Sequence, residues 1–147
     1  MLCCALAACG GNVTSAQTVT YVATLRGENE RPRATASAAT GSAVFALSGG
    51  TATYTVTAVG FAGALTVGHV HIGAGNATGP VIVPFTIIAQ SGTVAAGSIA
   101  LRLPIAQGNI TISGDSLRAL FDAGLAYVNL YSAAYPDGEI RGQILRQ

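Results

Sequence analysis

Several residue types that define common protein classes are scarce in this sequence. Only 9% of the 147 residues are charged, the formal net charge is +1, and tryptophan is absent. All seven basic residues are arginines, and they are scattered along the chain. Without a basic patch, a nucleic-acid partner is excluded. No stretch reaches 18 uninterrupted apolar residues, so we expect no membrane-spanning helix.

The three cysteines lie within the first nine residues, so residues 10–147 can form no internal disulfide. Leu6-Ala-Ala-Cys9 resembles the lipobox of bacterial lipoproteins, which implies that Cys9 receives the lipid. We therefore interpret residues 1–17 as a lipoprotein-like leader and tether. Only eight residues precede Cys9 and none is basic, which suggests that the true start lies upstream. The alternative is an apolar N-terminus without a signal function.

Residues 18–147 read as one domain. Half of the sequence is apolar and 19 residues are glycine, which favours strands and turns over a helical bundle. The clearest strand is 51–58, where threonine alternates with apolar residues. Short strand-like segments recur between turns, at 19–25, 41–47, 51–58, 65–72, 81–88, 98–103, 109–112, 126–131 and 139–145. The predicted fold is all-β, a Greek-key or immunoglobulin-like β-sandwich or barrel.

One short helix is predicted at residues 115–123. Asp115 or Ser116 can cap its N-terminus and Gly124 can end it. The spacing i, i+3, i+4 indicates a single apolar face, formed by Leu117, Leu120 and Phe121. Pro84 interrupts the segment 81–88, which indicates a sheet edge or a bulge.

His69 and His71 are the only histidines, and they are two residues apart on a predicted strand. Alternation places both on one side, from which two imidazoles can bind one metal ion. Zinc and copper(II) need further donors. The candidates are main-chain carbonyls and the side chains of Asn129, Tyr131, Asp137 and Glu139. The alternative is that the histidines bond to the backbone and hold the glycine-rich loop 73–79, a hairpin-type connection.

The segment around the last turn has simple structural interpretations. Asp137-Gly138 is a favoured turn dipeptide. Glu139 and Arg141 fall on one side of a strand, which predicts an ion pair. Glu28 and Glu30 offset the charges of Arg31 and Arg33 in a polar loop. No arrangement of nucleophile and base stands out, so we do not expect an enzyme.

Five blocks in order resemble the CHRD (chordin-type) domain, which is found in bacterial exported proteins. The most specific block runs from Tyr127 to Gln143, and it contains Tyr-Pro-Asp-Gly-Glu-Ile-Arg-Gly-Gln. The other four are Val22-Ala-Thr-Leu-Arg-Gly-Glu-Asn-Glu-Arg-Pro32, Gly41-Ser-Ala-Val-Phe45, Tyr54-Thr-Val-Thr-Ala-Val-Gly60 and Gly68-His-Val-His-Ile-Gly73. The resemblance implies an extracytoplasmic all-β domain and no proven catalysis. The family usually has histidine where this chain has Tyr131.

The sequence leads to two main functional hypotheses, and to a third that derives from the second, a redox or hydrolytic enzyme built on the bound metal. The first is an exported protein of the bacterial cell envelope, lipid-anchored or secreted, with a binding or structural role toward an unknown protein or envelope ligand. Its only contact with the membrane would be the lipid on Cys9. The second is a copper- or zinc-binding envelope protein that uses His69 and His71, with Tyr131 at the position that would complete a histidine cluster.

Overall fold

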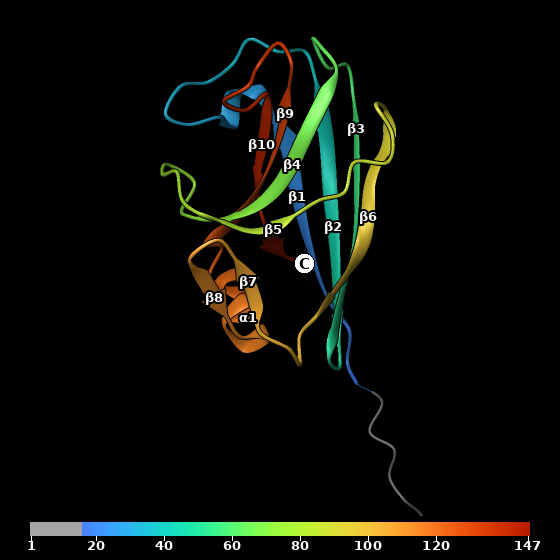
Figure 1. Cartoon of the computed structure of the whole chain (residues 1–147), viewed down its shortest axis with the longest axis vertical. Coiled ribbons are helices and arrows are strands. Elements are labelled where there is room, and N and C mark those ends of the chain that lie inside the picture. Colours follow the sequence, from blue (N-terminus) through green and yellow to red (C-terminus); the bar gives the residue numbers. More distant parts are fainter. Residues whose placement is uncertain (1–15) are drawn as a thin grey trace, which may run out of the picture.

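The computed structural model describes residues 16–147, which form an all-β domain with one short helix. The large sheet is antiparallel and curls into a half-barrel, with strand order β5-β4-β9-β10-β1-β2-β3-β6 and with β11 paired to β1 (Figure 1). Its strands are β1 (Val19–Arg26), β2 (Thr40–Ser48), β3 (Thr51–Val59), β4 (Leu65–Ile72), β5 (Val81–Pro84), β6 (Gly92–Ala100), β9 (Ala126–Ser132), β10 (Ile140–Gln143) and β11 (Leu145–Arg146). A separate hairpin joins β7 (Ile105–Gln107) to β8 (Ile110–Ile112).

The strand β3 shows how the sequence pattern selects the sheet. Its alternating residues divide into exposed threonines and side chains that face the core, among them the fully buried Ala52 and Val56. The two-residue turn between β2 and β3 pairs Ser48 with Thr51, and Gly49 adopts a positive φ of 56° there. Glycine meets this requirement without steric cost.

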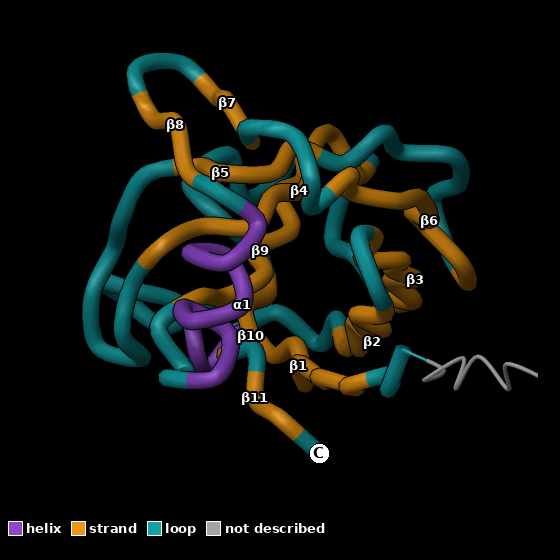
Figure 2. Tube along the Cα trace, turned by 90° about the horizontal axis from the view of Figure 1, so that it is seen from below, coloured by secondary structure: helices purple, strands orange, loops and turns teal. Residues whose placement is uncertain are grey.

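The structure confirms one α-helix, α1 (Gly114–Asp122), which lies beside the open end of the half-barrel (Figure 2). A 3-10 turn, η1 (Gly27–Asn29), follows β1. The N-cap of α1 is Ser113, whose Oγ accepts a hydrogen bond from the Ser116 amide at 3.1 Å. The prediction of Asp115 or Ser116 as the cap was therefore wrong by two or three residues, because Ser113 already has extended backbone angles. Gly124 follows the helix with φ 64°.

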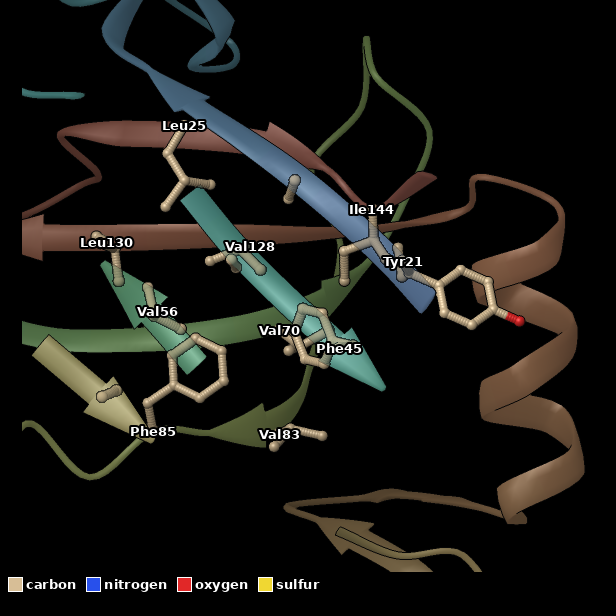
Figure 3. Packing of buried hydrophobic residues seen from close by; sticks show 14 of the residues in the cluster. Tyr21, Leu25, Phe45, Val56, Val70, Val83, Phe85, Val128, Leu130 and Ile144 are labelled. Carbon is tan, nitrogen blue, oxygen red and sulfur yellow. The ribbon is translucent and has the colours of Figure 1, made fainter. Parts of the chain in front are cut away.

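Apolar side chains from the whole sheet and from α1 meet inside the half-barrel (Figure 3). Phe121 of α1 packs edge-on against Tyr21 and Phe45, with ring centroids 5.3 and 5.2 Å apart. Val70, Val128 and Leu130 of β4 and β9 point into the same core. Their neighbours along each strand must therefore face outward, and these outward residues form the site described below.

Several predicted strands differ from the structure: 139–145 is divided into β10 and β11, β7 was not predicted, and the boundaries of two further strands changed. β5 ends at Pro84. It is an edge strand, and its pairing with β4 shifts register between Val70 and His71, so the predicted sheet edge and the predicted bulge are both present. The segment predicted at 98–103 begins instead at Gly92 and ends at Ala100. Its first half is rich in glycine and alanine, so its strand structure comes from pairing with β3 rather than from propensity. Among residues 16–147 no helix has the length and apolar character needed to cross a membrane.

Candidate functional site

The outward face of β4, β9 and β10 carries a row of polar and aromatic side chains. Antiparallel pairing sets His69 opposite Asn129, His71 opposite Tyr127, and Val67 opposite Tyr131. Strand β10 pairs with the other side of β9 and adds its own outward residues to the row. The predicted common orientation of the two histidines is present, and the register brings Tyr131 to them.

The two histidines and Tyr131 form one cluster. The hydroxyl of Tyr131 lies 2.9 Å from Nε2 of His71, and Nδ1 of His71 lies 2.9 Å from the carbonyl oxygen of Gly79. Because a carbonyl only accepts, Nδ1 of His71 carries the proton, Nε2 accepts, and the Tyr131 hydroxyl donates. The ring of His69 lies 5.5 Å from that of His71 and 5.4 Å from that of Tyr131, centre to centre. Its buried Nδ1 has no hydrogen-bond partner in the described part of the chain.

Burial sets the protonation states in this cluster. It lowers the pKa of His69 and that of His71, although the hydrogen bond to Gly79 opposes the change at His71. It also raises the pKa of Tyr131 to about 12, with smaller contributions from Tyr127 and Glu30. At neutral pH both imidazoles are therefore neutral, the state that binds metal ions, and the phenol keeps its proton.

A stack of three side chains, one each from β4, β9 and β10, extends the cluster across these strands. The ring of His71 lies parallel to that of Tyr127, with centroids 4.9 Å apart and planes at 4°. On the Tyr127 ring lies the guanidinium of Arg141, whose Cζ is 3.5 Å from the ring centroid. This is cation–π geometry. Arg141 is only 2% exposed, and burial lowers its pKa.

The same face holds the loop 73–79 between β4 and β5, which is the predicted hairpin-type connection. Nη2 of Arg141 donates to the carbonyls of Ala74 and Ala77 at 2.9 and 2.8 Å. The amide of Gly79 donates to the Tyr127 hydroxyl at 3.1 Å, and the Gly79 carbonyl is bonded to His71. His71 therefore bonds to the backbone and holds the loop, which is the alternative to metal binding that the sequence left open.

Gln143 fastens the start of the loop. Its Nε2 donates to the carbonyl of Gly73 and to that of Gly124, both at 2.7 Å. Arg141, Gln143 and Tyr127 were not proposed as site residues from the sequence. The available signal was their alternation in one strand pair, Tyr127 in β9 and the other two in β10, on the side that carries the histidines.

Glu30 is a buried carboxyl group next to this face, not a solvated partner of Arg31 as the sequence suggested. It is 2% exposed, and its Oε2 accepts from Nδ2 of Asn129 at 3.3 Å, while Oε1 has no partner within residues 16–147. Burial raises its pKa to about 7, although Asn129 and Arg141 favour the charged form. Asn129 is thus engaged with Glu30 and not with the histidines.

The predicted ion pair between Glu139 and Arg141 is wrong. Oε1 of Glu139 accepts from the hydroxyl of Ser37 and the amide of Ala62, at 2.6 and 2.8 Å. The only salt bridge in the described residues joins Arg146 and Asp122. Glu139 lies just before β10 begins at Ile140, so strand alternation does not set its direction.

The remaining candidates stay away from the histidines. Asp137 is exposed in the turn before Gly138, as its turn role predicts. Nowhere in residues 16–147 do three or more His, Cys, Asp or Glu side chains gather in a group that could hold a metal ion. Asp137 and Glu139 therefore do not join His69 and His71. Cys9 lies outside the residues that the structure describes.

The fold and the outward face define a curled, antiparallel all-β domain with a loop fastened across the polar side of its sheet. The chain belongs to the CHRD family, because the CHRD domain model matches residues 21–144. No curated protein and no solved structure matches the chain.

We expect Glu30→Gln to change the pH dependence of stability. Because the pKa of Glu30 is raised from 4.5 to about 7, this group contributes stability that is fully present below pH 4.5 and lost as pH rises through 7. The variant avoids this loss, so its stability relative to wild type should rise by up to about 3 kcal/mol between pH 4.5 and 8.

Urea unfolding of both proteins across this range measures the difference and cancels the opposite pH dependence of the histidines. Glu28→Gln, at an exposed carboxylate in the same segment, should stay within about 0.5 kcal/mol of wild type at every pH. Parallel pH profiles for Glu30→Gln and wild type would show that burial does not hold the Glu30 proton.

Proposed function

We propose that this CHRD domain is a binding module exported to the bacterial cell envelope, and that it binds rather than catalyses. The observation that carries the proposal is the fastened loop 73–79. Asn76 and Thr78 are exposed, while the carbonyls of Ala74 and Ala77 are bonded to Arg141 and that of Gly79 is bonded to His71. A loop held in one shape loses little conformational entropy when it binds, and loops on rigid scaffolds commonly carry binding residues.

The side chains that could carry chemistry support a binding role. The Arg141 guanidinium donates hydrogen bonds to the loop carbonyls, and the Glu139 carboxylate accepts hydrogen bonds from Ser37 and Ala62. The Tyr131 phenol keeps its proton, because burial raises its pKa to about 12. These groups stabilise the shape of the face, and the partner is a protein or another ligand of the envelope.

We expect the double variant Asn76→Ala/Thr78→Ala to lose binding to the envelope. The probe is the washed envelope fraction of the producing bacterium, mixed with full chain in which Cys3, Cys4 and Cys9 are serine so that no lipid contributes. The parent protein with the natural loop should cosediment with the envelope fraction. The loop variant should show a cosedimenting fraction lower by at least about half.

The matched control is Thr55→Ala, because Thr55 is exposed on β3 away from the loop. It should bind as the parent does. Absence of cosedimentation by the parent protein, or equal binding by the loop variant, would contradict this role for the loop.

We propose further that the protein is anchored through a lipid on Cys9, on the basis of the lipobox-like Leu6-Ala-Ala-Cys9. When the gene is expressed with its natural upstream DNA, labelled palmitate should be incorporated into wild type and into Cys3→Ser and Cys4→Ser. Cys9→Ser should incorporate none. If other lipoproteins of the host incorporate the label and the wild-type protein does not, the lipid anchor is contradicted and the secreted form is favoured.

A second candidate function is binding of copper or zinc, favoured by the convergence of His69, His71 and Tyr131. Two imidazoles that bind one ion at 2.0–2.1 Å have ring centres about 5–6 Å apart, and the observed separation is 5.5 Å. The bond from Nδ1 of His71 to Gly79 leaves Nε2 as the ligating atom, a common support for a metal-bound histidine. The protonated Tyr131 is the weak member, since it occupies Nε2 and is a poor ligand.

We expect Tyr131→His to bind Cu(II) or Zn(II) at least about tenfold more tightly than wild type, because it supplies the missing third imidazole. Tyr131→Phe keeps the ring without a ligating atom and should differ from wild type by less than about threefold. The measurement is metal titration of the full chain with the three cysteines replaced by serine, since thiolates would bind the same ions.

The double variant His69→Ala/His71→Ala should lose the binding. Wild-type binding weaker than about 10 μM together with no gain in Tyr131→His would remove the metal function. So would equal binding by the double histidine variant.

A further inference from the structure

A groove with a volume of about 400 Å³ lies where β10 and β11 meet β1, on the outer side of the sheet. Its polar lining includes Asn29, Arg31, Arg141 and Gln143, and its apolar lining is Val22 and Leu145. The groove adjoins the fastened loop through Gly75 and contains neither histidine. A role for it therefore goes beyond the proposed function.

The charged side chains that line this groove are of one sign, and the terminal carboxylate of Gln147, a residue that also lines it, makes no ion pair with an arginine in the described chain. Two guanidinium groups line it, and none of the described side chains in the lining is a carboxylate. Buried charges in proteins are normally paired with an opposite charge. Arg141 is 2% exposed, yet its Nη2 bonds only to two neutral carbonyls and no salt bridge involves it within residues 16–147.

Arg31 is held beside the groove in the same way. Its Nη1 donates to the carbonyls of Glu28 and Glu30, at 3.1 and 2.7 Å. The carboxyl group of Glu30 does not line the groove, and burial raises its pKa to about 7, so it carries only part of a charge at neutral pH. Burial lowers the pKa of Arg141; the charge of Glu30 raises this pKa, and the positive charge of Arg31 lowers it further. The two cations therefore repel one another, and Glu30 is only a partial counter-charge to Arg141.

Arg141 also keeps donors for a ligand. Its Nε and Nη1 donate no hydrogen bond within the described chain, and they are not among its fully buried unpartnered atoms, so they reach solvent. Because Arg141 lines this groove, a ligand in the groove can reach those donors. Nε and Nη1 of one guanidinium point in different directions, so each can donate a single charge-assisted hydrogen bond to an oxygen of a carboxylate or phosphate.

We propose that this groove is a binding site for an oxyanion, a carboxylate or phosphate group that lies between Arg31 and Arg141. The apolar part of the ligand that carries the anion would cover Val22 and Leu145. The anion would supply the full counter-charge at Arg141 that Glu30 supplies only in part.

The test is titration of the full chain, with Cys3, Cys4 and Cys9 changed to serine, with sodium acetate and separately with inorganic phosphate at constant ionic strength. Two-dimensional NMR follows the Nε signal of Arg141 and the side-chain amides of Asn29 and Gln143. We expect saturable shifts with a dissociation constant in the range of about 0.1–10 mM, as for a single ion-sized ligand. The tighter of the two probes identifies the carboxylate or the phosphate as the anion.

Arg31→Gln should weaken the binding at least about fivefold. Arg33→Gln should leave it within about twofold, because Arg33 is an exposed arginine two residues away that does not line the groove. A second pair guards against loss of folding in the arginine variant. Thr24 is an exposed residue of β1 that lines the groove. Thr24→Glu should weaken anion binding, because its carboxylate would compete for the arginines, whereas Thr24→Gln should leave the binding unchanged.

Absence of saturable shifts with either anion up to about 50 mM would overturn the proposal. Equal losses in Arg31→Gln and Arg33→Gln would overturn it as well, because they would show a general charge effect. Equal affinities of Thr24→Glu and Thr24→Gln would have the same meaning. None of these outcomes bears on loop 73–79 or on the histidine pair, so the proposed functions are judged separately.

Discussion

The constraint on which the site depends is the need of the loop 73–79 for hydrogen-bond donors. Within the loop, one backbone bond joins the Ala77 amide to the Ala74 carbonyl, so most of its polar groups need partners elsewhere. The sheet supplies these partners through side chains, foremost the guanidinium of Arg141. Burying that guanidinium then requires the Tyr127 ring beneath it, which in turn stacks on His71.

This arrangement ties loop shape, histidine chemistry and charge to one another. The Gly79 carbonyl fixes the proton of His71 on Nδ1, and so leaves Nε2 to Tyr131 or to a metal ion. Because Arg141 donates to neutral carbonyls, its charge is left for the groove where β10 and β11 meet β1. One buried cation thus supports both the fastened loop and the proposed anion site.

Much of the fold follows from local pattern, whereas the site follows only in part. Alternation in β3 and the i, i+2 spacing of His69 and His71 fix which side chains share a face, and both were predictable. The burial of Glu30 and Arg141 was not, because charged residues in a polar loop and on a strand normally face solvent. They are buried by the loops 27–35 and 73–79, whose path over the sheet leaves no periodicity in the sequence.

The most direct test of this account is amide hydrogen exchange of the loop in wild type and in Arg141→Lys. Lysine keeps the charge but cannot reproduce the planar stack on Tyr127 together with two carbonyl bonds. We expect exchange at Ala77 and Gly79 to accelerate at least about tenfold while the β2–β3 amides change little, with Arg146→Lys as the surface control. Unchanged exchange at both loop amides would contradict the claim that Arg141 fastens the loop to the sheet.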